Sequence, residues 1–251
     1  MQQQVYEAQE YATEGMAADA HLHLDLFEDP EATVKAAREA GVGILVSAGS
    51  NYESNKKNAK IANGGIYAVV GIDPEFALTE DAGVLEKLEE IITNNSNIIG
   101  IGEIGLDYKK AVDDLQRNRQ KMFFERQLEI AQKMDLPVVV HSRNSFDDVI
   151  EIIRSYKVRV MFHYFEGGKD DATLAEKFGI ISVPPFDSKK RRAAIKAVGI
   201  GSIVAETDSP VVGKTPSDVF KSIAIIAAAR GISYEEAIAR TTENLRNFFR
   251  I

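Results

Sequence analysis

The sequence contains no cysteine and no tryptophan, and it has only four histidines. The absence of cysteine excludes disulfides, thiolate nucleophiles and cysteine-based zinc sites. No stretch approaches the eighteen or more uncharged apolar residues that a membrane span needs, and the first sixteen residues lack the basic and apolar regions of a secretory signal peptide. We therefore expect a soluble, cytoplasmic protein that does not associate with a membrane.

An excess of positive charge is also missing, because the formal net charge is −8 and the sequence pI is about 5.2. A protein that holds long duplex nucleic acid by counterion release normally presents a basic face. The acidic balance therefore argues against tight non-specific binding of long duplexes. It leaves open a reaction on nucleic-acid ends or small phosphate esters, because bound cations can invert the local field.

The sequence does contain a regular alternation of short apolar runs and amphipathic segments. The runs are rich in valine and isoleucine and almost continuously hydrophobic, as expected of parallel strands buried on both faces. The eight predicted strands are 18–22, 43–48, 66–72, 98–103, 137–141, 158–163, 179–184 and 202–206. The predicted helices between and after them are 30–41, 51–63, 82–95, 114–134, 145–156, 170–178, 187–198, 216–230 and 233–248.

Eight strand–helix pairs in 251 residues favour a closed barrel over an open doubly wound sheet. No linker or change of composition divides the chain. We therefore predict an α/β protein with a single (β/α)8 TIM-type barrel formed by residues 17–251, preceded by a flexible leader of residues 1–16. The charged segment 109–114 is expected to form a loop over the barrel mouth.

All four histidines stand at the ends of predicted strands. His21 and His23 end the first strand, His141 ends the fifth and His163 the sixth. In a (β/α)8 barrel the carboxyl ends of the strands surround the active-site mouth. His21 and His23 also lie on the same side of a strand, which suits two ligands of one ion. A pair of this kind alone is as often structural, but four strand-end histidines together predict a metal site.

Two carboxylates complete the predicted metal site. Glu103 ends the fourth predicted strand in IGEIGLD, and Asp208 follows the eighth in AETDSP. Either acid alone is more commonly a helix cap or a buried acceptor. With the histidines they supply four nitrogens and two acids, enough for one or two divalent ions. We predict that Glu103 bridges the ions and that Asp208 holds the attacking water as a base. Mg²⁺, Mn²⁺ and Zn²⁺ are the candidate metals.

Other polar and aromatic residues lie beside the predicted ligands. Asp19, Asp25 and Glu206 are candidates for orienting the imidazoles through their second ring nitrogen. Tyr108 and Phe165 border the predicted mouth, where an aromatic face can stack on a base. For Phe165, packing in the core is an equally good interpretation.

Candidate substrate contacts follow from the same strand ends. Arg143 lies two residues after His141 and so shares its face of the strand. A guanidinium there can bind a phosphate, and a salt bridge within the mouth is the alternative. Tyr164 is placed to stack on a base, and Lys214 to neutralise phosphate. The basic run 189–192 either attracts a nucleic-acid backbone or forms an ordinary solvated helix face.

At these positions the sequence resembles the TatD family of metal-dependent hydrolases. The motifs that carry the resemblance are DAHLHL (19–24), GEIGLDY (102–108), PVVVHSRN (137–144), HYFEGG (163–168), ETDSP (206–210) and TTENLRNFF (241–249). They follow the family's order from residue 19 to the C-terminus. The resemblance implies a TIM-type barrel with a one- or two-metal site that hydrolyses phosphodiesters, often as a 3′–5′ exonuclease on DNA or RNA. The ligands that it implies are His21, His23, Glu103, His141, His163 and Asp208.

Two positions depart from the family pattern. After the third strand the family usually has a histidine where this chain has Asp73, and Glu166 is an addition within HYFEGG. Both changes make the mouth more acidic than that of a standard nuclease. A different ester substrate, such as a D-aminoacyl-tRNA, therefore stays open as an alternative.

Two further functions are open. Amide and lactone hydrolases of the same superfamily often bridge their metals with a carbamylated lysine, and the fourth predicted strand offers Glu103 and no lysine. A protein that binds metal without catalysis would not need all six ligands together. The sequence therefore predicts a metal-dependent hydrolase of ester bonds, most specifically a 3′–5′ exodeoxyribonuclease.

Overall fold

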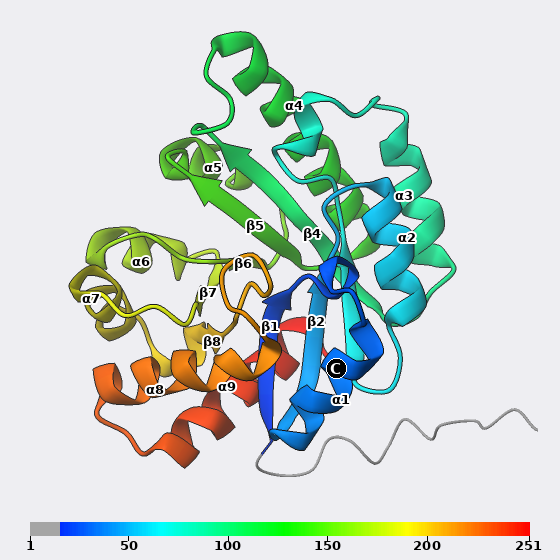
Figure 1. The fold of residues 1–251 in the computed structure, drawn as a ribbon. Helices are drawn as coiled ribbons and strands as arrows, with labels where there is room; N and C mark the ends of the chain where they lie inside the picture. Colours follow the sequence, from blue (N-terminus) through cyan, green and yellow to red (C-terminus); the bar gives the residue numbers. More distant parts are fainter. Residues whose placement is uncertain (1–15) are drawn as a thin grey trace, which may run out of the picture.

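The computed structural model describes residues 16–251 (Figure 1). The expected leader, residues 1–16, lies outside the described residues apart from Met16, whose carbonyl accepts a hydrogen bond from Thr242 Oγ1 (3.3 Å). Eight parallel strands form one sheet in the order of the sequence. They are β1 (Ala17–Leu22), β2 (Val42–Ala48), β3 (Ile66–Val70), β4 (Ile98–Asp107), β5 (Val138–Arg143), β6 (Val160–Phe162), β7 (Gly179–Val183) and β8 (Ile203–Ala205).

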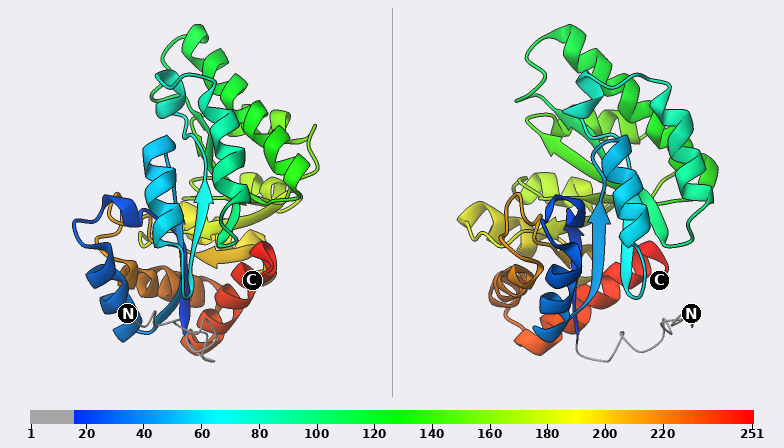
Figure 2. Two further views of the ribbon diagram at one scale, coloured as in Figure 1. Left: turned by 90° about the vertical axis from the view of Figure 1, so that its right-hand side faces the viewer. Right: turned by 45° about the vertical axis from the view of Figure 1, so that its right-hand side comes forward.

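The sheet curves into a nearly closed barrel, as the three views in Figures 1 and 2 show. Each strand from β1 to β7 pairs in parallel with the next. The gap between β8 and β1 is bridged just past the end of β8. There the Asp208 N–H donates to the His21 carbonyl, and the His23 N–H donates to the Ser209 carbonyl, both at 2.8 Å. The predicted (β/α)8 barrel is confirmed.

Helices alternate with the strands and cover the outside of the barrel (Figure 2). They are α1 (Pro30–Glu39), α2 (Tyr52–Ile61), α3 (Val84–Thr93), α4 (Asp114–Met134), α5 (Phe146–Ile153), α6 (Lys169–Ala175), α7 (Lys189–Ala197), α8 (Val219–Arg230) and α9 (Tyr234–Phe249). Asp29, Asp113, Ser188 and Ser233 cap four of them by accepting the backbone N–H three residues on. None of the helices within residues 16–251 has the length and apolar character needed to cross a membrane.

The strands build two apolar layers, one inside the barrel and one beneath the helices. The inner layer contains small and branched side chains such as Ala20, Val46 and Val139. Phe248 and Phe249 of α9 belong to the same layer, and α9 lies across the end of the barrel where the strands begin (Figure 1). This packing leaves the opposite end, at the carboxyl ends of the strands, free to carry polar side chains.

A register irregularity in β1 turns two histidines toward that end. Ala20 belongs to the inner layer and Leu22 to the outer one, which a regular two-residue alternation does not allow. The pairing with β2 shifts between Asp19 and Leu22. His21 and His23 consequently occupy the inward side of the strand, away from Leu22.

β4 extends past the predicted end of this strand and finishes at Asp107. The prediction that Glu103 ends the strand is therefore wrong. Pairing with β5 continues because Gly105 allows a close approach: its φ is +137°, and a Cβ there would lie 2.1 Å from the His141 carbonyl oxygen. The polar Glu103 in an apolar run thus marks an inward-facing position within the strand rather than its end.

Candidate metal centre

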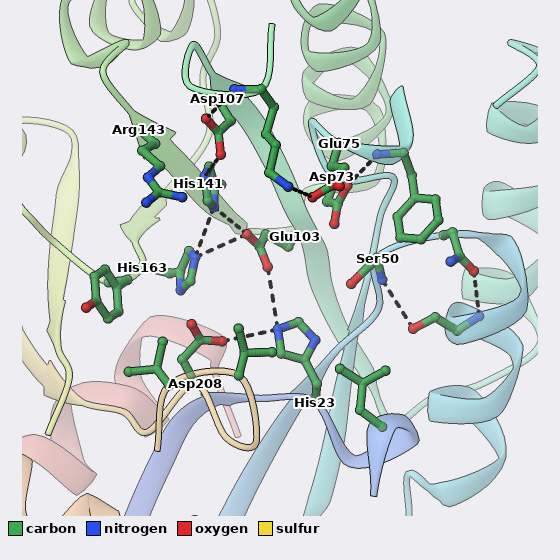
Figure 3. A pocket seen from close by; sticks show the side chains of 18 of the residues that line it. His23, Ser50, Asp73, Glu75, Glu103, Asp107, His141, Arg143, His163 and Asp208 are labelled. Carbon is green, nitrogen blue, oxygen red and sulfur yellow. Dashed lines mark hydrogen bonds and ion pairs between the residues drawn. The ribbon is translucent and has the colours of Figure 1, made fainter. Parts of the chain in front are cut away.

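A cavity of about 520 Å³ opens at the carboxyl ends of the strands. Figure 3 shows polar side chains that meet in it. The six predicted ligands are brought together here from β1, β4 and β5 and from the turns after β1, β6 and β8. They are His21, His23, Glu103, His141, His163 and Asp208. All except the half-buried His141 are buried.

Glu103 lies between His23 on one side and His141 and His163 on the other (Figure 3), and its two carboxylate oxygens face different pairs of histidines. Oε1 lies 2.7 Å from His141 Nδ1 and 3.1 Å from His163 Nε2. Oε2 lies 3.4 Å from His21 Nε2 and 3.7 Å from His23 Nε2. One carboxylate therefore joins two pairs of imidazoles, which is the arrangement that a residue bridging two ions needs.

Asp208 completes the side of the cluster formed by the first histidine pair. Its Oδ1 lies 3.2 Å from His23 Nε2 and 3.7 Å from His21 Nε2. Ligand atoms of His21, His23 and Asp208 all lie within 4.8 Å of one another, and so do those of His21, Glu103 and His163. Each group is compact enough to bind an ion.

Several buried polar atoms of the cluster lack a hydrogen-bond partner. Among the described residues, Nδ1 and Nε2 of His21, Nδ1 of His163 and Oε2 of Glu206 are enclosed without one. Native proteins rarely leave such atoms unpaired, because each costs about 1–3 kcal/mol. A cation between His21 and Glu103 would give Nε2 of His21 a partner. The residues present therefore fit a metal ion.

The electrostatics show that the carboxylates of this cluster attract positive charge. Burial disfavours the imidazolium of His23, but the hydrogen bond to Asp208 and the charge of Glu103 outweigh it and raise the pKa of His23 to about 9. Burial is likewise outweighed at His141, where Asp107 and Glu103 raise the pKa to about 9. Burial alone would raise the pKa of Glu103, yet the facing histidines hold it well below its usual value. The carboxylates therefore favour positive charge on His23 and His141, as they would favour a cation in the same place.

A family model described as TatD related DNase matches residues 18–250. The chain belongs to this family. Deoxyribonuclease TATDN3 of Homo sapiens is 30% identical over an alignment of 256 residues, which covers 92% of this chain and 93% of the relative. The uncharacterized metal-dependent hydrolase YjjV of Escherichia coli K12 is 29% identical, with 76% of this chain and 78% of the relative covered. The crystal structure of YJJV, a TatD homologue, matches with a TM-score of 0.88 at 25% identity over 95% of this chain and 100% of that one.

Membership of the TatD-related DNase family confirms the resemblance seen in the sequence motifs. It also confirms the prediction of a metal-dependent hydrolase, because curated relatives over most of the chain are named as metal-dependent hydrolases or deoxyribonucleases. The His, Asp and Glu cluster described above is able to bind metal.

Two of the predicted substrate contacts of this TatD-family chain line the cavity. They are Arg143 and Tyr164. Figure 3 shows the guanidinium of Arg143 on the same side of the cavity as His141 and His163. The Tyr164 ring lies beneath the guanidinium of Arg191, 5.7 Å from it, which leaves the phenol at the cavity wall.

Lys214 does not line the cavity and is exposed elsewhere. The loop after β8 folds back through a hydrogen bond from the Gly213 N–H to the Thr207 carbonyl (2.9 Å), so that Lys214 follows beyond the mouth. The prediction that Lys214 neutralises phosphate in this site is therefore not supported. Lys110 lines the cavity instead, from the predicted loop over the mouth, and its Nζ pairs with Glu75 at 2.8 Å.

The predicted aromatic and basic contacts lie to one side of the metal centre. Tyr108 and Phe165 line an adjacent cavity. The Tyr108 hydroxyl donates to the Asp148 carboxylate, and Phe165 is buried with its ring against Phe146. The basic run 189–192 begins α7 outside the lining of the metal cavity.

The three carboxylates predicted to orient the imidazoles have different positions. Glu206 is nearest to that role, with Oε2 3.6 Å from His163 Nδ1. Asp19 instead accepts hydrogen bonds from the N–H and hydroxyl of Thr207. Asp25 lines the cavity and accepts a hydrogen bond from an asparagine of α2.

Two groups that contact the ligands were missed by the sequence analysis. Asp107 Oδ2 lies 3.3 Å from His141 Nε2. Its spacing of four from Glu103 was an available signal, because residues at even spacing share one face of a strand. The carbonyl of Ala48 accepts a hydrogen bond from His23 Nδ1 (3.0 Å). No side-chain pattern could have indicated a backbone acceptor.

Proposed function

We propose that the chain is a metal-dependent phosphodiesterase that removes nucleotides from the 3′ end of DNA. The observation that carries the proposal is the position of Glu103, whose two oxygens face two separate pairs of imidazoles. Its human relative is named a deoxyribonuclease, which supports DNA as the substrate.

The proposed ligands form two groups that share one carboxylate. These groups are His21, His23, Asp208 and Glu103 for one ion, and Glu103, His141 and His163 for the other. The mixture of imidazole nitrogens and carboxylate oxygens is compatible with Mg²⁺, Mn²⁺ or Zn²⁺. When bound, such ions lower the pKa of water and stabilise charge on the oxygens of a phosphate during in-line displacement.

Asp208 is the proposed base. Burial raises the pKa of its carboxyl, but the hydrogen bond to His23 and the nearby imidazolium charges outweigh burial and keep the pKa below its usual value. The side chain is therefore ionised at neutral pH and can accept the proton of an attacking water. Arg143, at the wall of the cavity, is placed to bind the phosphate.

One observation favours a second candidate function, the hydrolysis of a D-aminoacyl-tRNA ester. Asp25, Asp73 and Glu166 line the same cavity. Carboxylates repel a polyanionic strand but offer acceptors to the ammonium group of an aminoacyl ester. The same metal ligands would serve both reactions, so only assays with each substrate distinguish the nuclease from the aminoacyl ester hydrolase.

Removal and replacement of metal tests the nuclease. We expect chelator-treated protein to be inactive on 3′-labelled single-stranded DNA, and we expect one of Mg²⁺, Mn²⁺ or Zn²⁺, added back separately, to restore release of mononucleotides. Asp208→Asn keeps the shape of the side chain but loses its charge, and should remain inactive with every ion. Absence of cleavage with any ion, despite bound metal, would contradict the nuclease and favour the aminoacyl ester. Cleavage of a D-aminoacyl-tRNA is then measured under the same conditions.

The role of Arg143 predicts a smaller effect. Arg143→Ala removes a charge-assisted contact worth about 1.5–3 kcal/mol, so kcat/KM for the oligonucleotide should fall about 10- to 100-fold. Steady-state kinetics at several salt concentrations measure this loss. Arg154→Ala, which removes a guanidinium paired with Glu151 at 3.1 Å outside the cavity, is the matched control. Equal effects of the two variants would exclude a specific role for Arg143.

A further inference from the structure

The side of α2 that is buried against the barrel is polar. Its buried residues are Ser54, Asn55 and Asn58, whereas the next helix, α3, buries only aliphatic side chains. Helices that cover a barrel normally bury apolar stripes. A buried amide costs free energy unless all of its donors and acceptors are hydrogen-bonded. The buried polar side chains of α2 therefore need specific hydrogen-bond partners in the barrel.

Asn58, which is 1% exposed, connects the end of β2 to the segment after β1. Its Nδ2 donates to the Ala48 carbonyl (3.2 Å) and to Asp25 Oδ1 (2.9 Å). Its Oδ1 accepts from the Ser47 hydroxyl (2.6 Å). Ser47 Oγ in turn accepts the Leu24 N–H (2.9 Å). The Ala48 carbonyl and the Asp25 carboxylate can only accept, so the amide atom that faces them is the donor Nδ2, and Oδ1 is left to accept the Ser47 proton.

The Ala48 carbonyl is shared between Asn58 and His23. It accepts from His23 Nδ1 at 3.0 Å as well as from the amide of Asn58. A carbonyl can only accept, so Nδ1 of His23 carries a proton. In the neutral ring Nε2 therefore holds the free electron pair. That nitrogen faces Asp208 Oδ1 at 3.2 Å and Glu103 Oε2 at 3.7 Å.

We propose that Asn58 is a positioning residue that sets the metal affinity of His23. It holds the Ala48 carbonyl in place, and this carbonyl fixes the tautomer and the ring orientation of His23. Asn58 itself does not line the cavity, and it reaches the predicted ligands through the Ala48 carbonyl and His23, while its second bond holds Asp25 at the cavity wall. The inference rests on the proposed function, because it requires His23 to be a ligand. Partners of a ligand's second ring nitrogen typically change metal affinity by 10- to 100-fold.

Calorimetric titration of chelator-treated protein with Mn²⁺ tests this role. We expect Asn58→Ala to weaken the binding of one ion by about 10- to 100-fold and to change the other much less. Asn58→Asp is nearly isosteric and can still accept from Ser47, but it cannot donate to Ala48. It should show a similar loss. The unfolding midpoint of each variant is measured, and titrations are made well below it.

Asn244→Ala is the matched control. Asn244 Nδ2 donates to the carbonyls of Ile200 and Ile203, both at 2.7 Å, away from the metal cavity. Its replacement removes two hydrogen bonds to backbone carbonyls, and replacement of Asn58 likewise removes one, to the Ala48 carbonyl. We expect a lower unfolding midpoint and an unchanged Mn²⁺ affinity.

His23→Ala is titrated in parallel to separate the two proposals. Unchanged Mn²⁺ binding in His23→Ala would contradict the ligand set and therefore the proposed function. Weakened binding in His23→Ala, with both Asn58 variants binding as tightly as Asn244→Ala, would overturn the positioning role alone. Weakened binding in His23→Ala and in both Asn58 variants supports the inference.

Discussion

Replacement of Glu103 by glutamine is expected to prevent binding of the two ions together and to lower kcat/KM by at least about 10³-fold. Loss of a single electrostatic contact to a transition state typically costs 10²–10³-fold in rate. Glu103 serves both histidine pairs, one with each oxygen, so its loss should exceed the effect of an ordinary ligand. Glutamine offers one neutral oxygen, which cannot balance two cations. Metal content by elemental analysis and steady-state kinetics on single-stranded DNA measure the effect.

The metal-free Glu103→Gln protein should remain folded. Glutamine has nearly the same shape, and the apolar layers of the barrel do not include this position. Glu176→Gln is the control, because Glu176 also accepts two hydrogen bonds, from the Gly199 N–H and the Ser202 hydroxyl, but outside the cavity. It should keep full activity and metal content. Two ions still bound in Glu103→Gln would show that Glu103 does not bridge them.

The barrel and the convergence of the six proposed ligands can be predicted from the sequence, because both depend on repeated local patterns. Apolar runs separated by amphipathic segments define the strands, and the fold places the ends of all strands at one mouth. His163 directly follows β6, whereas β5 ends two residues beyond His141, so the prediction that His141 ends its strand is wrong. Both histidines still lie near the mouth, and their convergence follows from the topology without any knowledge of side-chain contacts. Glu103 was correctly expected near the histidines although the end of its strand was placed four residues too early.

The parts of the site that the sequence did not predict depend on details of the backbone conformation, which a periodic sequence pattern does not contain. Lys214 was expected in the site because its loop follows β8, but the bond from Gly213 to Thr207 turns the loop back. The inward orientation of His21 depends on a shift in strand register. The proposed role of Asn58 depends on contacts with Ser47, Ala48 and Asp25, which belong to other elements of the fold. The sequence signal for this contact is the polarity of the buried side of α2, where Ser54, Asn55 and Asn58 replace the apolar residues expected of a helix that covers a barrel.

Replacement of Asp19 by alanine is expected to lower the free energy of unfolding by about 3 kcal/mol. Asp19 is completely buried and accepts the Thr207 N–H (2.9 Å), the Thr207 hydroxyl (2.5 Å) and the His21 N–H (3.3 Å). Its loss leaves buried donors unpaired, at about 1–3 kcal/mol each. For a domain of this size the midpoint of thermal unfolding should fall by about 6–12 °C. Calorimetry of the metal-free protein measures the change without a contribution from bound ions.

The same replacement should also weaken metal binding, because Asp19 connects β1 to the segment that carries Asp208. Thr207 directly precedes Asp208, and the Asp208 N–H is bonded to His21 across the seam of the barrel. Freed from Asp19, this segment no longer holds the carboxylate against the imidazoles. Thr207→Val, which removes the hydroxyl but keeps the bonded N–H, should cost only about 1 kcal/mol and leave metal affinity nearly unchanged. An Asp19→Ala protein with normal stability but weak metal binding would instead make Asp19 part of the metal centre. Normal metal binding with reduced stability would limit its role to closing the barrel.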